Sequence, residues 1–269
     1  MAGGMRGIMG TVSLILIAGA LVLMFFVVLS GVKDSTPLNK TYFLRTDTSS
    51  ITGARPISQW TYFYVCGDGN TDCGSPVPDL PFGYAWVGGG SGAPSDFLGG
   101  HGKDTTSKYY FFLWRFGWVF YLMGLVSTVV AFFTALLAPC SRLASGFSGV
   151  VLMFALFFYT MGVSLMTAEF VKAHDAFNRA GLTSKIGRYA FGFSWGAWAA
   201  IFLATIFLFL GCGAGGRSDD KVRSSRRTNG ATGGGLGNVG FFRRQRSRRS
   251  ARGSFVDNES QRRVKDEYA

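Results

Sequence analysis

The sequence predicts an all-α membrane protein: a four-transmembrane-helix bundle with a small, disulfide-clamped, β-containing extracellular loop domain. Hydrophobic residues make up 48% of the 269 residues and charged residues only 16%, against roughly 25% charged residues in soluble domains. Four apolar runs are long enough to cross a hydrocarbon core, which takes about 20 residues in helical form. Two cysteines lie close together in the longest segment between these runs. The composition argues against a soluble enzyme.

The first apolar run predicts a transmembrane helix over 8–32, after a short cytoplasmic N-terminus over 1–7. Arg6 before the run and Ser30 near its end also fit a cleaved signal peptide. The run is longer than the roughly 7–15 apolar residues of a signal peptide. Its length therefore favours a retained anchor.

The segment 33–109 is too long for a plain connector and predicts a small extracellular domain. Aromatic and β-branched stretches bounded by Gly, Pro, Asp and Asn are typical of short strands. The stretches that show this pattern are 40–46, 58–67 and 84–88.

Cys66 and Cys73 are the two cysteines of this segment, and the residues between them include the turn formers Gly67, Gly69 and Asn70. In an oxidising compartment they predict a disulfide that closes a hairpin. The alternative is two free thiols. A zinc site is disfavoured, because no further cysteine or histidine lies nearby to complete four ligands.

Asn39 begins the triplet Asn-Lys-Thr, a candidate acceptor for N-glycosylation. It stands so close to the first span that its occupancy stays open. A second such triplet begins at Asn258, in the predicted cytoplasmic tail, where it should stay unmodified.

The other three apolar runs predict transmembrane helices. They cover 110–138, 147–171 and 189–212, with a cytoplasmic turn over 139–146 and a short extracellular loop over 172–188. None of the runs as drawn holds an internal proline, which would remove a helix hydrogen bond.

The distribution of basic residues predicts that both termini are cytoplasmic. Residues 211–269 hold 14 Lys or Arg and six Asp or Glu, whereas 33–109 holds six bases and seven acids. An excess of Lys and Arg beside a span is typical of the cytoplasmic side. Four bases in 172–188 count against this orientation but do not outweigh the tail.

Arg115 and Glu169 are charged residues inside predicted spans, both near the extracellular ends. An ion pair between them would lower the cost of burying each charge and would fix two helices together. The alternative is that each side chain reaches separately to the headgroups. Either role is structural, since one pair near one face does not form a transport path.

Small residues recur at every fourth position of the last span. Such a stripe permits close approach of another helix or another copy of the chain. Its members are Gly192, Gly196, Ala200 and Ala204.

Cys140 and Cys212 lie beside the membrane on the predicted cytoplasmic side, where reversible palmitoylation occurs. The alternative is that each is a plain small apolar residue.

The segment 213–269 is rich in Gly, Ser and Arg and poor in aliphatic residues, which predicts a disordered basic cytoplasmic tail. A cluster of arginines there is expected to bind anionic phospholipids, and phosphorylation of nearby serines would release it. The arginines are Arg243, Arg244, Arg246, Arg248, Arg249 and Arg252, and the serines are Ser247, Ser250 and Ser254. The alternative is that these arginines only set the orientation of the chain in the membrane and keep the tail soluble.

The sequence predicts no catalytic, cofactor-binding or metal-binding residues. Residues 192–196 spell G-x-S-x-G around Ser194, but this motif begins an apolar span with no preceding strand, unlike a hydrolase nucleophile turn. We interpret the match as a coincidence.

Four spans, a long first outer loop, Trp60 before Cys66 and Cys73, and a polar tail together resemble the claudin-like tetraspanners. The stretch 37–86, with PLNKTYFLRTDTSSI and WTYFYVCGDGNTDCGSPVPDLPF, is more similar to their fungal relatives. These are the cortical-patch (eisosome) membrane proteins, a family that includes PalI-type pH-response proteins. The tryptophan stands six positions before Cys66, farther than in claudins, so claudin barrier or pore function is not carried over.

The resemblance implies a plasma-membrane organiser of cortical patches that influences endocytosis, sphingolipid balance and cell-wall construction. It implies peripheral eisosome coat proteins as partners and no enzymatic activity. The bilayer itself and further copies of the chain are also expected partners, and nucleic acid is not. The alternative function is a PalI-like accessory component of an ambient-pH sensor. A transporter or channel is disfavoured, because no row of ionisable residues crosses a span.

Overall fold

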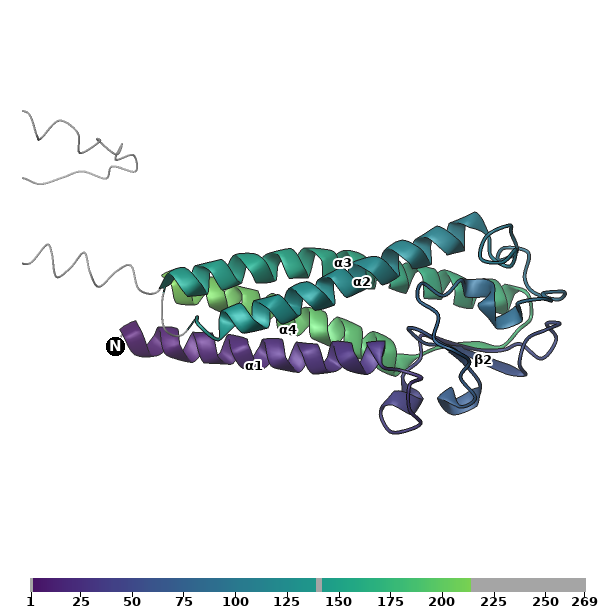
Figure 1. Ribbon diagram of the computed structural model, residues 1–269, viewed down its shortest axis with the longest axis horizontal. Helices are drawn as coiled ribbons and strands as arrows, with labels where there is room; N and C mark the ends of the chain where they lie inside the picture. The colour runs from purple at the N-terminus through teal and green to yellow at the C-terminus, as the bar shows by residue number, and fades with distance from the viewer. Residues whose placement is uncertain (1, 139–141, 214–269) are drawn as a thin grey trace, which may run out of the picture. The chain divides into compact units, whose positions relative to one another are not determined.

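Four long helices form the body of the protein in a computed structural model, which describes residues 2–138 and 142–213. They lie alongside one another (Figure 1) and each is long and apolar enough to cross a membrane. Their bounds are α1 Ala2–Val28, α2 Lys108–Ala135, α3 Arg142–Arg179 and α4 Arg188–Gly213. The predicted four-helix bundle is confirmed.

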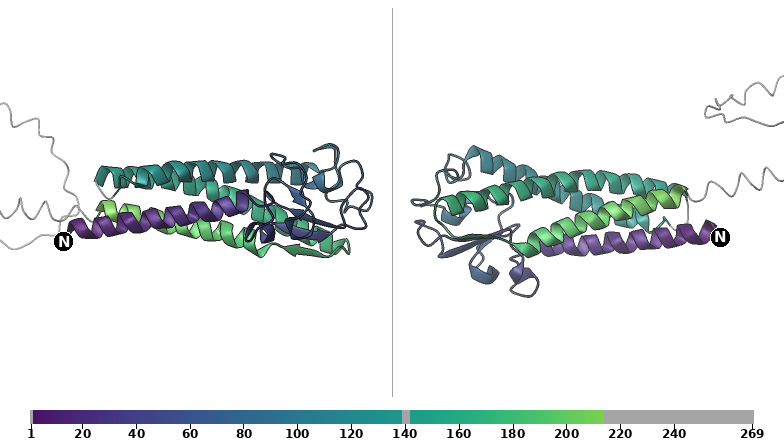
Figure 2. Two further views of the ribbon diagram at one scale, coloured as in Figure 1. Left: turned by 60° about the horizontal axis from the view of Figure 1, so that its bottom comes forward. Right: turned by 180° about the vertical axis from the view of Figure 1, so that it is seen from behind.

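The two ends of the bundle differ. The first residues of α1 and the last turn of α4 lie at one end, which we call the terminal end (Figures 1 and 2). A small folded domain lies at the other end, which we call the loop end. This loop domain consists of residues 29–107 together with 180–187, the connection between α3 and α4.

Helix α3 differs most from its predicted span, since it continues beyond 171 to Arg179. The added turns keep an apolar face, because Ala173, Ala176 and Phe177 are all fully or almost fully buried. Side chains at such spacings share one side of a helix. The extension therefore packs against the loop domain instead of ending at the span.

The α2–α3 contact is close because glycines lie on the facing sides. A Cβ atom on Gly162 would lie 2.5 Å from the backbone nitrogen of Tyr121, and one on Gly124 would lie 2.8 Å from Cα of Tyr159. Only a residue without a side chain fits at such distances. We call Gly117, Gly124 and Gly162 the glycine contact.

The loop domain contains a four-stranded antiparallel sheet in the order β3-β2-β1-β4. Its strands are β1 Leu44–Asp47, β2 Ile57–Trp60, β3 Val65–Cys66 and β4 Ser184–Ile186. Leu44 pairs with Trp60 on one side and with Ile186 on the other. The sheet therefore joins the long loop after α1 to the short connection before α4.

The prediction of a strand over 84–88 is wrong. The chain forms a 3-10 helix there, η3 Phe82–Trp86. Phe82, Gly83 and Trp86 are buried, whereas Tyr84 and Ala85 between them are partly exposed, so burial does not alternate residue by residue as it does along a strand. Two shorter 3-10 helices, η1 Leu38–Lys40 and η2 Asp68–Asn70, complete the loop domain.

Candidate functional site

Aromatic side chains fasten the loop domain to the helices. Trp60 is only 2% exposed and stacks on Phe82 with ring centroids 4.9 Å apart. Its indole Nε1–H donates a hydrogen bond to the carbonyl oxygen of Phe82 at 2.9 Å. Phe177 of α3 reaches the same group, with its ring 4.6 Å from that of Phe97. We call this group the junction cluster; its members are Phe43, Trp60, Phe82, Trp86, Phe97 and Phe177.

The predicted disulfide between Cys66 and Cys73 is confirmed. It closes the turn that carries Asn70, whose side chain is buried beneath it. The Asn70 Nδ2 amide donates to the carbonyl oxygens of Leu38 and Thr41, each at 2.8 Å. The disulfide thus holds a turn whose polar contacts join separate parts of the loop domain.

An ion pair lies beside this turn. Arg45 Nε donates to Asp68 Oδ1 at 2.8 Å, and this hydrogen bond lowers the pKa of Asp68. The Asp68 side chain is 59% exposed, so water screens the pair and its contribution to stability is small.

Arg115 pairs with Asp79 of the loop domain at 2.7 Å, not with Glu169 as the sequence suggested. The Arg115 side chain is half exposed and turns toward the loop, whereas Glu169 lies on the interior side of α3 and is fully buried. Arg115 is thus directed to the loop domain and Glu169 to the interior, and the two side chains do not pair. Burial raises the pKa of Asp79, and the positive charge of Arg115 acts in the opposite direction.

Glu169 has no hydrogen-bond partner for either carboxylate oxygen among the described residues. A buried carboxyl group without a partner costs stability. Sequence analysis identified this residue as unusual, but neither of its two alternatives, a pair with Arg115 or a separate reach to the headgroups, matches the buried position of Glu169.

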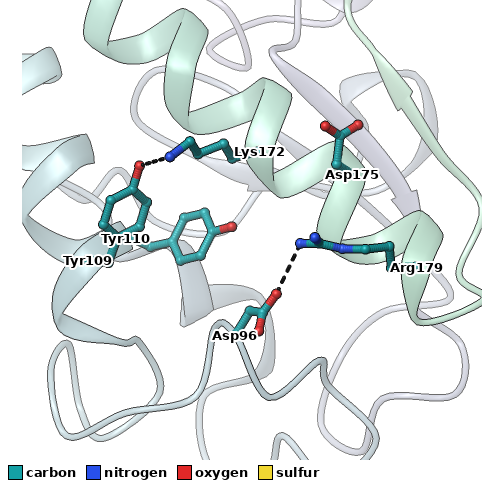
Figure 3. Close-up of a pocket in the computed structure, with 6 residues that line it drawn as sticks. All are labelled: Asp96, Tyr109, Tyr110, Lys172, Asp175 and Arg179. Atoms are coloured by element: carbon teal, nitrogen blue, oxygen red, sulfur yellow. Dashed lines mark hydrogen bonds and ion pairs between the residues drawn. The ribbon is translucent and has the colours of Figure 1, made fainter.

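A polar pocket of about 420 Å³ opens between the loop-end turns of α2 and α3 (Figure 3). Lys172 donates to the hydroxyl oxygen of Tyr109 at 2.7 Å on one side. Arg179 donates to Asp96 of the loop domain at 3.2 Å on the other. The hydroxyl of Tyr110 points into the space between these pairs, and Asp175 completes the wall. Sequence analysis missed this pocket, because its residues come from three separate segments.

The structure divides the predicted small-residue stripe on α4. Gly192 is exposed with nothing within 4 Å of an added Cβ, Gly196 lies against Leu23 of α1, and Ala204 is buried. A spacing of four residues advances about 40° per step around a helix of 3.6 residues per turn. The four residues are three such steps apart, about 120° in all, so they do not all face one neighbour and the stripe does not form one contact surface.

Three hydroxyl groups meet at the centre of the bundle, a contact that sequence analysis also missed. The Tyr121 hydroxyl lies 3.3 Å from that of Tyr159 and 3.4 Å from that of Ser194, and the Tyr159 hydroxyl donates to the carbonyl oxygen of Ser194 at 3.0 Å. These hydrogen bonds connect α2, α3 and α4. Ser194 of the G-x-S-x-G match therefore lies among tyrosines in the described bundle.

Of the remaining predicted sites, some lie within the described residues and others lie outside them. Asn39 lies in η1 and is partly exposed, and Cys212 is a free, partly buried cysteine in the last turn of α4. Cys140, the arginine cluster and the candidate phosphoserines lie outside the described residues. Within 2–138 and 142–213, no group of three or more metal-ligating side chains comes together.

The chain is similar to fungal membrane proteins. A profile of the SUR7/PalI family matches residues 9–207. Protein SUR7 of Candida albicans is 32% identical over 206 residues, covering 74% of this chain and 72% of that protein. SUR7 family protein FMP45 of Saccharomyces cerevisiae is 32% identical over 203 residues, covering 70% and 63%. The plasma membrane protein YNL194C of the same yeast is 26% identical over 206 residues, covering 74% and 64%.

These alignments span roughly two thirds of each relative. The matched residues 9–207 contain the whole loop domain, α2, α3 and most of α1 and α4. The basic tail lies beyond the match.

Proposed function

Because the chain belongs to the SUR7/PalI family of membrane proteins, we propose that it is a non-enzymatic plasma-membrane organiser of fungal cortical patches, the eisosome-associated membrane domains. In this role it influences endocytosis, sphingolipid balance and cell-wall construction. The observation that carries the proposal is that the family match covers the loop domain and the helices together, and that the junction cluster packs these two parts onto each other.

This packing suits an organiser because it couples contacts made outside the membrane to contacts made within it. The helices expose large apolar side chains along their length, among them Val126 at 61%, Phe133 at 62% and Phe154 at 57%. Such a surface faces lipid or another copy of the chain. Phe177 contacts the loop domain and belongs to α3, the helix that also carries the exposed Phe154.

We further propose that the loop domain is extracellular and both termini are cytoplasmic. The Cys66–Cys73 disulfide supports this orientation, because disulfides persist in oxidising compartments. The basic tail supports it through the positive-inside rule. On the cytoplasmic side, the arginine cluster of the tail would contact anionic phospholipids, and the tail would contact the peripheral coat.

Imaging of a C-terminally tagged chain in living fungal cells tests this function. We expect immobile cortical patches with slow recovery after photobleaching. A version that ends at Gly216 separates recruitment by the tail from recruitment by the helices, and a full-length version with the six arginines changed to Gln is its matched control. A uniform, freely diffusing plasma-membrane signal from the full chain would contradict the organiser and favour the PalI-like sensor.

A further inference from the structure

The polar pocket continues into an apolar groove on the outer side of α2. The groove has a volume of about 610 Å³. Apart from Tyr109, it is lined by Lys108, Phe112, Leu113, Phe116 and Phe120 of α2 and by Leu165 of α3. Tyr109 lines both spaces: its hydroxyl accepts the hydrogen bond from Lys172 in the pocket, and Tyr109 also lines the groove. A polar space and an apolar space therefore meet at one residue.

The groove matches an acyl chain in length. Phe112, Phe116 and Phe120 follow at intervals of four residues with ring centroids 6.4 Å apart, so they form a row along α2. From Tyr109 to Phe120 the helix rises about 16 Å at 1.5 Å per residue. This length is close to half of the roughly 30 Å hydrocarbon core, which is one leaflet.

The polar pocket balances its charges. Lys172 and Arg179 supply two positive charges, and Asp96 and Asp175 supply two negative ones. Arg179 and Asp96 are 71% and 55% exposed, so their mutual ion pair is weak and can be exchanged for a ligand. Asp175 also contacts His174 at 3.2 Å but is 62% exposed. Lysine and arginine bind phosphate oxygens, and carboxylates accept hydrogen bonds from an ammonium or hydroxyl group.

We propose that the pocket and groove together bind one phospholipid with a zwitterionic headgroup, from the leaflet at the loop end. Its phosphate lies between Lys172 and Arg179, its ammonium group faces Asp96 and Asp175, and one acyl chain follows the row of phenylalanines. The apolar groove selects a lipid over a free phosphate compound, because a soluble headgroup leaves that groove uncovered. Within the pocket that receives the headgroup, the balanced charges select a zwitterionic lipid over an anionic one; Lys108 lines the groove and not this pocket.

Native mass spectrometry of the full chain, titrated with phosphatidylethanolamine, tests this site. We expect the double variant Lys172→Ala/Arg179→Ala to weaken binding about tenfold or more, the effect of losing one charge-assisted contact. The matched control Lys33→Ala/Lys185→Ala removes two exposed cations at the same end and should bind normally. Retention of the Cys66–Cys73 disulfide and of helical circular dichroism shows that each variant is folded.

The groove is tested separately. Phe112→Ala/Phe116→Ala should also weaken binding severalfold, through lost apolar contact, whereas Phe133→Ala/Phe154→Ala removes two lipid-facing phenylalanines elsewhere and should not. Glycerophosphoethanolamine, which lacks acyl chains, and diacylglycerol, which lacks the phosphate, should compete poorly.

Three results would overturn the proposal. They are equal binding by the pocket variant and its control, competition by glycerophosphoethanolamine as strong as that of the intact lipid, or tighter binding of phosphatidic acid than of phosphatidylethanolamine. The lipid site and patch formation are tested independently. A variant that loses lipid binding but still forms patches, or one that loses patches but still binds lipid, shows that failure of one proposal is not failure of the other.

Discussion

The junction cluster packs the loop domain onto α3 and the glycine contact packs α2 against α3, and the two contacts use different means. At the loop end, large aromatic rings such as Trp60 and Phe97 are removed from water, so the hydrophobic effect favours the contact. Along the spans, the surrounding lipid is as apolar as the side chains, and association depends on close packing and hydrogen bonds. There the chain uses Gly124 and Gly162 at backbone distance, and the hydroxyls of Tyr121 and Tyr159. The solvent around each contact explains why one uses the largest residues and the other the smallest.

The largest effect is expected at the junction cluster. Trp60→Ala removes a fully packed ring and the hydrogen bond to Phe82, and should lower the free energy of unfolding by about 3–5 kcal/mol. Thermal unfolding of the purified chain, followed by near-ultraviolet circular dichroism, measures this change. Trp195→Ala, at a tryptophan that is 39% exposed, is the control and should change stability by less than about 1 kcal/mol. Equal losses would show that the cluster has no special role.

Opening the disulfide should have the next largest effect. Closing a loop of seven positions restricts the unfolded chain and contributes about 2.5 kcal/mol in the chain-entropy model. Cys66→Ser/Cys73→Ser should therefore unfold the loop domain at lower denaturant concentration, while the helical signal of the bundle persists. If the loop domain and the helices unfolded together, the junction cluster and the glycine contact would not be separate. As a control, addition of a reductant to the unmodified chain should reproduce the effect of the double variant.

At the glycine contact, Gly162→Ala should destabilise the bundle by about 2 kcal/mol, because the added methyl group meets the Tyr121 backbone. Gly192→Ala introduces the same atom where nothing lies within 4 Å. Since Ala favours a helix over Gly by up to about 1 kcal/mol, this control should be neutral or stabilising. Resistance of the helices to unfolding in detergent measures both. A neutral Gly162→Ala would refute the importance of close approach.

The smallest effects concern two aspartates of the loop domain and have opposite signs. Asp68 has a lowered pKa, so its contribution is present above the usual value of 3.8 and is lost as the pH falls through the lowered value. Asp79 has a raised pKa, so its contribution is full below 3.8 and is lost as the pH rises through the raised value. The free energy of unfolding of Asp68→Asn and Asp79→Asn is measured from pH 3 to pH 7. Asp68→Asn should remove a loss of stability on acidification, and Asp79→Asn should remove a loss of stability as the pH rises. Parallel changes would contradict these directions.

Features with a local signal could be predicted from the sequence. The four spans follow from long apolar runs, and the disulfide follows from two nearby cysteines around a turn. Both signals are complete within a short segment. The family resemblance likewise depended largely on one stretch, 37–86, which contains Trp60, Cys66 and Cys73.

Features that depend on distant segments could not be predicted. Strand β4 has only three residues, too few to show an alternating pattern, and it becomes recognisable only beside β1. The predicted partner of Arg115 was Glu169, an acid within a span, whereas its partner in the structure is Asp79 of the loop domain. The polar pocket joins α2, α3 and Asp96, and no pattern in the sequence connects these three.

The position of β4 sets an order for the synthesis of the protein. Thr46 in β1 shares a hydrogen bond with Ser184 in β4, 138 residues later in the chain. At roughly 5–20 residues per second of translation, on the order of ten seconds pass between the synthesis of β1 and the synthesis of β4, its second neighbour in the sheet. During that interval α2 and α3 must already have entered the membrane, because β4 directly follows them. A nascent chain with a misplaced third helix therefore leaves one edge of β1 unpaired, and an unpaired strand edge can pair with another chain.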